Sequence, residues 1–180
     1  MPLLIKDATK FALRGQKRQR SDDNKGTQIY TVRINDDGYD FQLVPSGSID
    51  IRVIMEPLAV GEGRFIMSLG INQDLFNELA RVEAGLRELL LERYPEVAWQ
   101  SALRPADETW GAALRIKFYD DLQIYDENGE LTKAPKAWRS SRVVPVLNLK
   151  VWTNEKDASV WWTMAAVKTS KPEPRAFDFI

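Results

Sequence analysis

Short runs of β-branched and aromatic residues, separated by turn residues, recur along most of this sequence. Such residues are enriched in strands, and alternation of apolar with polar side chains is typical of a strand that buries one face. The runs lie at 28–35, 40–44, 49–55 (ended by Pro57), 64–69, 112–119, 122–125, 143–152 and 159–168. Seven or eight strands joined mainly by turns favour an antiparallel meander or barrel over repeated βαβ units.

One stretch, residues 74–94, has the period of an amphipathic helix instead. Its apolar residues recur at intervals of three and four, and charged residues occupy the opposite face. Asn72 or Asp74 is suited to cap the start, and the helix is expected to end before Pro95. A further short turn or helix is expected over residues 97–103.

The 180 residues fit one domain with tails. Residues 1–26 are polar and rich in Lys and Arg, and are expected to form a basic, partly mobile arm. The barrel is assigned to residues 27–170, and residues 171–180, which contain two prolines, are expected to be an exposed tail. The predicted fold is mainly β (α+β), a small closed antiparallel barrel of OB-fold type with one inserted amphipathic helix and extra strands. A β-sandwich with a helical insertion fits the same string of elements.

The sequence contains neither Cys nor His. Thiolate nucleophiles, Ser-His-Asp and Cys-His arrangements, and zinc sites built from these side chains are therefore excluded. Adjacent carboxylates such as Asp36-Asp37 and Asp120-Asp121 fall at predicted turns or strand ends, where Asp is common for backbone reasons. We therefore expect no enzyme activity, no cofactor and no metal.

No run approaches the roughly 20 apolar residues of a membrane-spanning helix. The apolar start, Met1 to Ile5, is too short for the core of a signal peptide. Together with the absence of Cys, these features favour a reducing, intracellular compartment and no membrane partner.

Aromatic and basic residues fall together in the last third of the chain, where residues 110–162 hold five of the six Trp. Aromatic faces stack on unpaired bases, while Lys and Arg side chains follow the phosphates. The alternation in residues 112–119 places an apolar row on one face of the strand. The other face carries two cations and a phenol, namely Arg115, Lys117 and Tyr119. Adjacent Trp161 and Trp162 must point to opposite faces of a strand, so one of them is expected in the core. The candidate nucleic-acid-binding residues are Arg115, Lys117, Tyr119, Trp138, Arg139, Lys150, Trp152 and Trp161.

Residues 116–167 also carry a distinctive order of turns, prolines and tryptophans. An Asn-Gly turn is followed by the connection KAPKAWRSS, the strand RVVPVLNLKVWTN and a last strand SVWWTMAAV. This half of the chain resembles the OB-fold single-stranded DNA-binding proteins of bacteriophages and large nucleocytoplasmic DNA viruses. The resemblance implies a non-enzymatic protein that coats unpaired strands, without sequence specificity, in viral DNA replication or recombination. It also implies that Lys150, Trp152 and the aromatic residues of the final hairpin lie on or near the binding barrel.

The resemblance implies single-stranded DNA as the partner, and replication proteins as partners of the C-terminal tail. Members of that family commonly end in an acidic tail with a terminal aromatic residue. The tail here, PEPRAFDFI, is aromatic but only weakly acidic, which counts against a partner docked by the tail. A homo-oligomer is compatible with the sequence, and DNA is not distinguished from RNA by the residues.

A second hypothesis comes from another class of protein. Exposed Trp, Tyr and Arg residues are also enriched in protein interfaces. Under this hypothesis the chain is a structural or protein-interaction β-barrel, such as a virion component or an adaptor, and its exposed aromatic residues form a protein interface. An enzyme that uses only carboxylates is the third alternative.

Overall fold

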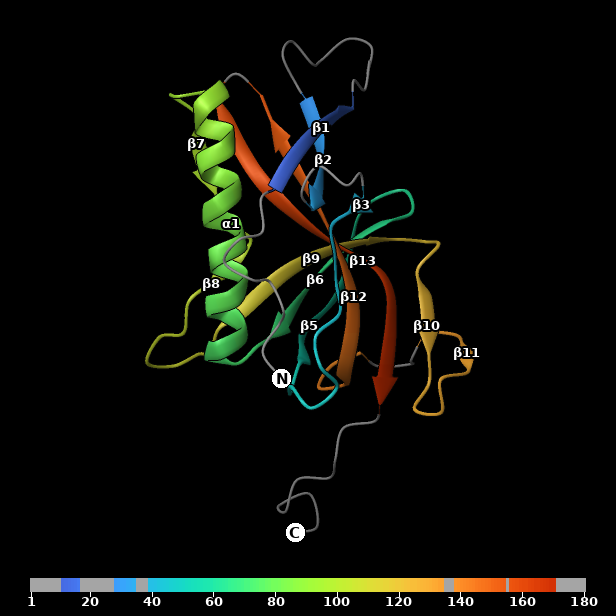
Figure 1. Ribbon diagram of the computed structural model, residues 1–180. Coiled ribbons are helices and arrows are strands. Elements are labelled where there is room, and N and C mark those ends of the chain that lie inside the picture. The colour runs from blue at the N-terminus through green and yellow to red at the C-terminus, as the bar shows by residue number, and fades with distance from the viewer. Residues whose placement is uncertain (1–10, 17–27, 35–38, 135–137, 155, 171–180) are drawn as a thin grey trace.

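The computed structural model describes a sheet-rich domain with one helix (Figure 1). The described residues are 11–16, 28–34, 39–134, 138–154 and 156–170. Two predicted features lie outside them, namely the basic cluster at residues 17–20 and the tail at residues 171–180.

The described residues form one helix and thirteen strands. In chain order they are β1 (Phe11–Gln16), β2 (Gln28–Ile34), β3 (Tyr39–Asp40), β4 (Gln42–Leu43), β5 (Arg52–Gly61), β6 (Arg64–Gly70), α1 (Gln73–Arg93), β7 (Ala98–Gln100), β8 (Leu103–Arg104), β9 (Ala113–Tyr119), β10 (Gln123–Tyr125), β11 (Leu131–Thr132), β12 (Arg142–Thr153) and β13 (Asp157–Ser170). The predicted mostly β composition with one helix is therefore confirmed.

Five of the strands pair in a ring. β12 pairs with β5, β5 with β6, β6 with β9, β9 with β13, and β13 again with β12. The β9–β13 pairing is parallel, whereas the other four pairings are antiparallel. β7 and β10 also pair with β13 in parallel. The prediction that the strands are all antiparallel was therefore wrong. Parallel neighbours need a long connection, and β10, β11 and β12 supply one between β9 and β13.

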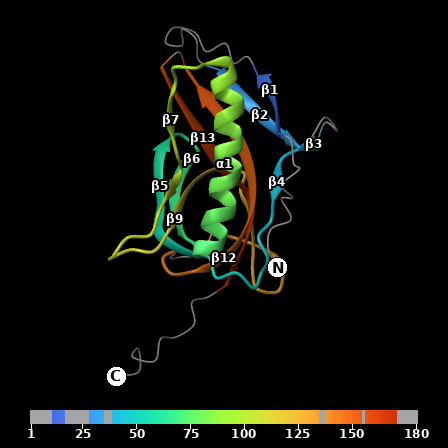
Figure 2. The same cartoon turned by 60° about the vertical axis from the view of Figure 1, so that its left-hand side comes forward.

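The helix α1 begins directly after Asn72, one of its two predicted caps. The side-chain oxygen of Asn72 accepts a hydrogen bond of 2.8 Å from the backbone N–H of Leu75. One stripe of α1 is buried, consisting of Leu75, Leu79, Val82, Glu83, Leu86 and Leu90. Both views show α1 running along one side of the curved sheet (Figures 1 and 2).

The segment that carries α1 is an insertion within one strand pair. Gly70, the last residue of β6, lies opposite Ala113, the first residue of β9. Residues 71–112 therefore leave and return at the same end of an antiparallel pair. In chain order, the helix thus lies between the second and third strands of the ring.

Three local expectations differ from the structure because tertiary pairing overrides local pattern. Residues 11–16, which belong to the arm expected to be partly mobile, form β1, which pairs antiparallel with β2. Residues 97–103, expected as a turn or helix, instead supply β7 and β8, which pair with β13 and β9. β5 continues through Pro57, where its register with β6 is irregular. Such an irregularity accommodates a residue that has no N–H to donate.

Candidate nucleic-acid interface

The alternation predicted for residues 112–119 is present in β9. The core row consists of Leu114, Ile116 and Phe118, all of which are buried. The outer row has Arg115 and Tyr119 exposed and Lys117 half-buried. A strand of this kind serves two purposes at once, because the apolar row anchors it while the polar row faces solvent.

The neighbouring strand β6 adds a further cation to this face. Arg64 lies opposite Tyr119, and Ile66 lies opposite Lys117. Directly opposite residues in an antiparallel pair project from the same face of the sheet. Arg64 and the outer row of β9 therefore share one surface.

Two tryptophans from the long hairpin of β12 and β13 stack on each other. The ring centroids of Trp152 and Trp161 lie 6.4 Å apart, and the ring planes are inclined by only 10°. In the β12–β13 register Trp152 lies opposite Ser159, which makes Trp161 its diagonal neighbour. Aromatic side chains can reach across such a diagonal. Both rings are half-buried, so part of each faces solvent.

Lys117 joins this stack to β9. Its Nζ lies 3.8 Å from the centroid of the Trp161 ring, within the range of a cation–π interaction. The β9–β13 register explains the contact, because Lys117 lies opposite Thr163, two residues from Trp161. Trp152, Trp161 and Lys117 therefore form one continuous row, which we call the aromatic–lysine row.

The surroundings of Lys117 disfavour its positive charge. Burial lowers the pKa of Lys117 below its ordinary value, and the nearby guanidinium groups of Arg115 and Arg64 lower it further. Three cations are therefore held close together on one face. A bound anion would relieve this repulsion, which makes the face suited to phosphate groups.

Trp162 is the core member of the adjacent pair. Its exposed fraction is 0%, and its Nε1 donates a hydrogen bond of 3.1 Å to Glu83 Oε1. Glu83 is itself buried in α1 and also accepts hydrogen bonds from the backbone N–H of Ala102 and the hydroxyl of Ser101. The expectation that one of the two tryptophans lies in the core is met by Trp162, with Trp161 on the outer face.

The remaining candidate residues lie in different places. Lys150 is half-buried and lies opposite Trp161 in the β12–β13 register, on the same face as the aromatic–lysine row. Trp138 is only 9% exposed and packs against Phe118, with ring centroids 6.3 Å apart. It is thus part of the core. Arg139 is exposed beside β5, where its backbone N–H donates to Glu56 at 3.4 Å.

Trp110 is a surface aromatic residue that the set of candidates omitted. It is 62% exposed and lies in the segment between β8 and β9. Its neighbours Asp107, Thr109 and Gly111 are typical loop residues. A tryptophan in such a polar context has no strand face to bury, and this signal could have identified it.

Within the described residues, no group of three or more carboxylates is arranged to hold a metal ion. In the same part of the chain, no helix combines the length and hydropathy that a membrane crossing requires.

No protein-family model matches the sequence, and no curated protein matches it either. Among solved structures, gp2.5, a single-stranded DNA-binding protein encoded by bacteriophage T7, matches with a TM-score of 0.55 at 15% identity, over 76% of this chain and 89% of that one. A C-terminal truncation of the single-stranded DNA-binding protein of bacteriophage Enc34 matches with a TM-score of 0.56 at 13% identity, over 91% and 97% of the two chains. The Enc34 protein in complex with single-stranded DNA matches with a TM-score of 0.54 at 12% identity, over 87% and 96%. This chain therefore has the fold of bacteriophage single-stranded DNA-binding proteins.

Proposed function

We propose that this protein binds single-stranded DNA, without sequence specificity, on the outer face formed by β6, β9, β12 and β13. The observation that carries the proposal is the aromatic–lysine row, in which stacked Trp152 and Trp161 meet Lys117. Flat rings beside cations are what an unpaired strand requires, because bases stack on the rings while phosphates meet the charges.

The strand pairings support a closed barrel of OB type. The ring β5–β6–β9–β13–β12 contains five strands and returns to its start. OB-folds are five-stranded barrels that bind oligonucleotides on the face of their second and third strands. In chain order β6 and β9 hold those places, and they carry Arg64, Arg115, Lys117 and Tyr119.

The contacts available on this face favour binding that does not read sequence. Every base has a face that can stack on Trp152 or Trp161, whereas base readout requires hydrogen-bonding groups aimed at base edges. A protein with such a surface can coat unpaired strands during DNA replication or recombination. The fold shared with bacteriophage proteins favours a viral setting and a non-enzymatic role.

One observation favours the second hypothesis, a protein interface. Apolar side chains of β5 are exposed, including Leu58 (57%) and Val60 (49%). Exposed apolar surface can mark a site of protein–protein interaction. The salt dependence of binding distinguishes the two functions. Each phosphate contact on a single DNA strand contributes about −0.7 to the slope of log K against log [salt], whereas an apolar protein interface responds much less to salt.

The test is a titration of the full chain with oligo-dT, followed by tryptophan fluorescence at low and high salt. We expect strong quenching that added salt reverses, and a weaker response to duplex DNA. Trp152→Ala and Trp161→Ala should each weaken binding by roughly 5- to 150-fold, which corresponds to about 1–3 kcal/mol per stacked base. The control is Trp99→Phe, because Trp99 lies opposite Ala158 in the β7–β13 register and lines a pocket with α1, on the other face of the sheet from the row.

An absence of binding at low salt would overturn the proposal. Normal binding by both alanine variants would also overturn it, since the row would then make no contact with the strand. In either case the aromatic face would have to be reassigned to a protein partner.

A further inference from the structure

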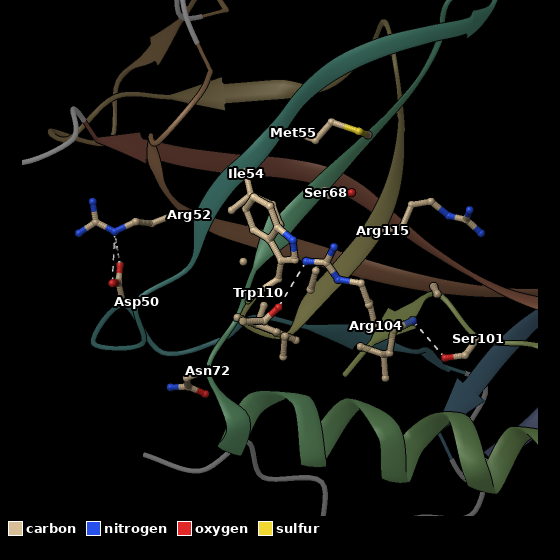
Figure 3. A pocket seen from close by; sticks show the side chains of 17 residues that line it. Asp50, Arg52, Ile54, Met55, Ser68, Asn72, Ser101, Arg104, Trp110 and Arg115 are labelled. Atoms are coloured by element: carbon tan, nitrogen blue, oxygen red, sulfur yellow. Dashed lines mark hydrogen bonds and ion pairs between the residues drawn. The ribbon is translucent and has the colours of Figure 1, made fainter. Parts of the chain in front are cut away.

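A pocket of about 750 Å³ lies beside the proposed strand-binding face. It is bounded by β5, β6 and β9 on one side and by residues 101–104 and 110–112 of the insertion on the other. Figure 3 shows Trp110 and Arg104 at the centre of this pocket, with Arg52 and Arg115 on opposite sides. The wall from β5 is apolar, because Ile54 and Met55 line it.

The backbone around Trp110 is fixed by a network of local hydrogen bonds. The carboxylate of Asp107 accepts from the backbone N–H of Thr109 at 2.8 Å and of Trp110 at 2.6 Å. The N–H of Asp107 in turn donates to the carbonyl of Trp110 at 2.8 Å. The hydrogen bonds from the N–H groups of Trp110 and Thr109 lower the pKa of the Asp107 carboxyl. A tryptophan that is 62% exposed is thus carried on an ordered turn, which reduces the entropy cost of binding a ligand against its ring.

The polar groups of the pocket favour an anionic ligand. Arg52, Arg104 and Arg115 line it, and Asp50 supplies a carboxylate. That carboxylate already pairs with Arg52 at 3.0 Å. The guanidinium of Arg104 contacts the carbonyl of Gly111 at 3.3 Å, which holds it next to the backbone of Trp110. A flat apolar group and an anion can therefore be bound together here.

Arg115 connects this pocket to the aromatic–lysine row. It lines the pocket, and Lys117, two residues further along β9, lies over the ring of Trp161. Alternate residues of a strand share a face and lie about 7 Å apart. A DNA strand that leaves the row along β9 therefore reaches the pocket without crossing the sheet.

We propose, building on strand binding at the row, that this pocket takes one further unpaired nucleotide of the same DNA strand. Its base lies against Trp110 with Ile54 and Met55 beneath, and its phosphate lies between Arg104 and Arg115. The insertion thereby lengthens the binding site beyond the barrel strands themselves.

The test compares wild type with Trp110→Ala and Trp110→Phe on a series of oligo-dT lengths at one salt concentration. Oligonucleotides too short to extend past the row should bind both variants like wild type. Longer ones should bind Trp110→Ala roughly 5- to 150-fold more weakly, as expected for the loss of one stacked base. Trp110→Phe should recover most of that loss, because it keeps an aromatic face. Thymidine monophosphate alone should compete only weakly, since the pocket supplies one contact among several.

Two failures are distinguishable. If wild type binds no oligonucleotide at low salt, strand binding itself is refuted, and this inference with it. If wild type binds and gains affinity with length while Trp110→Ala shows the same gain, the pocket takes no nucleotide. Because Trp110 is largely exposed, its substitution should leave the melting temperature near that of wild type, and this measurement verifies that the variant is folded.

Discussion

Replacement of Lys117 by Met should separate the stability of this fold from its binding. The lysine ammonium lies over Trp161. Its pKa is lowered by burial and, to a smaller extent, by nearby Arg115 and Arg64. A half-buried cation–π contact contributes about 1 kcal/mol, and a methionine sulfur against the same ring restores about 0.3–1.5 kcal/mol. These two contributions nearly cancel. What is left is the repulsion between Lys117 and Arg115, two residues apart on one strand at about 7 Å, or about 0.6 kcal/mol at the dielectric constant of water.

We therefore expect Lys117→Met to be as stable as wild type or slightly more stable. For a domain of this size, about 1 kcal/mol corresponds to a change in melting temperature of about 2–4 °C. The pKa of Lys117 is lower in the folded protein than in the unfolded chain. As the pH rises from that lowered pKa toward the ordinary value, the unfolded chain binds more protons, and the folded wild type becomes more stable. The advantage of the variant at pH 7 should therefore shrink as the pH approaches 10.5.

Binding should change in the opposite direction. The loss of one phosphate contact should weaken oligo-dT binding and reduce the slope of log K against log [salt] by about 0.7. Thermal melts at pH 7 and near pH 10, with titrations at several salt concentrations, measure both effects. Arg87→Met is the control, because it removes one charge from an exposed position of α1. A variant that melts many degrees lower and binds DNA normally would refute the reasoning, since Lys117 would then be a structural residue.

Three further predictions test other parts of the structure. Arg115→Gln should lower the salt slope by about 0.7 while leaving the melting temperature within about 2 °C, as measured by titration and thermal melts; an unchanged slope would remove Arg115 from the strand path. Burial raises the pKa of Glu83 above its ordinary 4.5, so the folded state holds the proton more tightly and stability from this group falls as pH rises through that raised pKa. In urea unfolding, the unfolding free energy of Glu83→Gln should thus exceed that of wild type most at pH 7 and least near pH 4.5. The reverse trend would contradict this account. Asn72→Ala removes the cap of α1 and should lower the unfolding free energy by about 1 kcal/mol; no change would mean that another group satisfies the Leu75 N–H.

The features that could be predicted from the sequence are those set by local period. Alternation in β9 separated Arg115 and Lys117 from the core row, and the 3–4 spacing located α1. The adjacency of Trp161 and Trp162 required the two rings to lie on opposite faces, with one of them in the core. All of these follow from the geometry of single strands and helices.

The remaining features depend on which segments meet in space. Trp138 has the same local context as a surface aromatic residue, but its ring packs against Phe118. The stacking of Trp152 on Trp161 depends on the register of β12 with β13. β1 and β7 exist because neighbouring strands offer unpaired backbone groups. No pattern within a single run encodes these contacts.

The shared end of β6 and β9 makes the segment between them a natural unit for exchange. Because Gly70 and Ala113 are already paired, a graft of different length at this point leaves the register of the ring intact. The graft must keep a helix with an apolar stripe and a group that accepts from Trp162 Nε1, or the core will open to water. Within that limit, the loop that bears Trp110 can be lengthened, shortened or replaced. The length of this loop can thus be redesigned separately from the ring of strands.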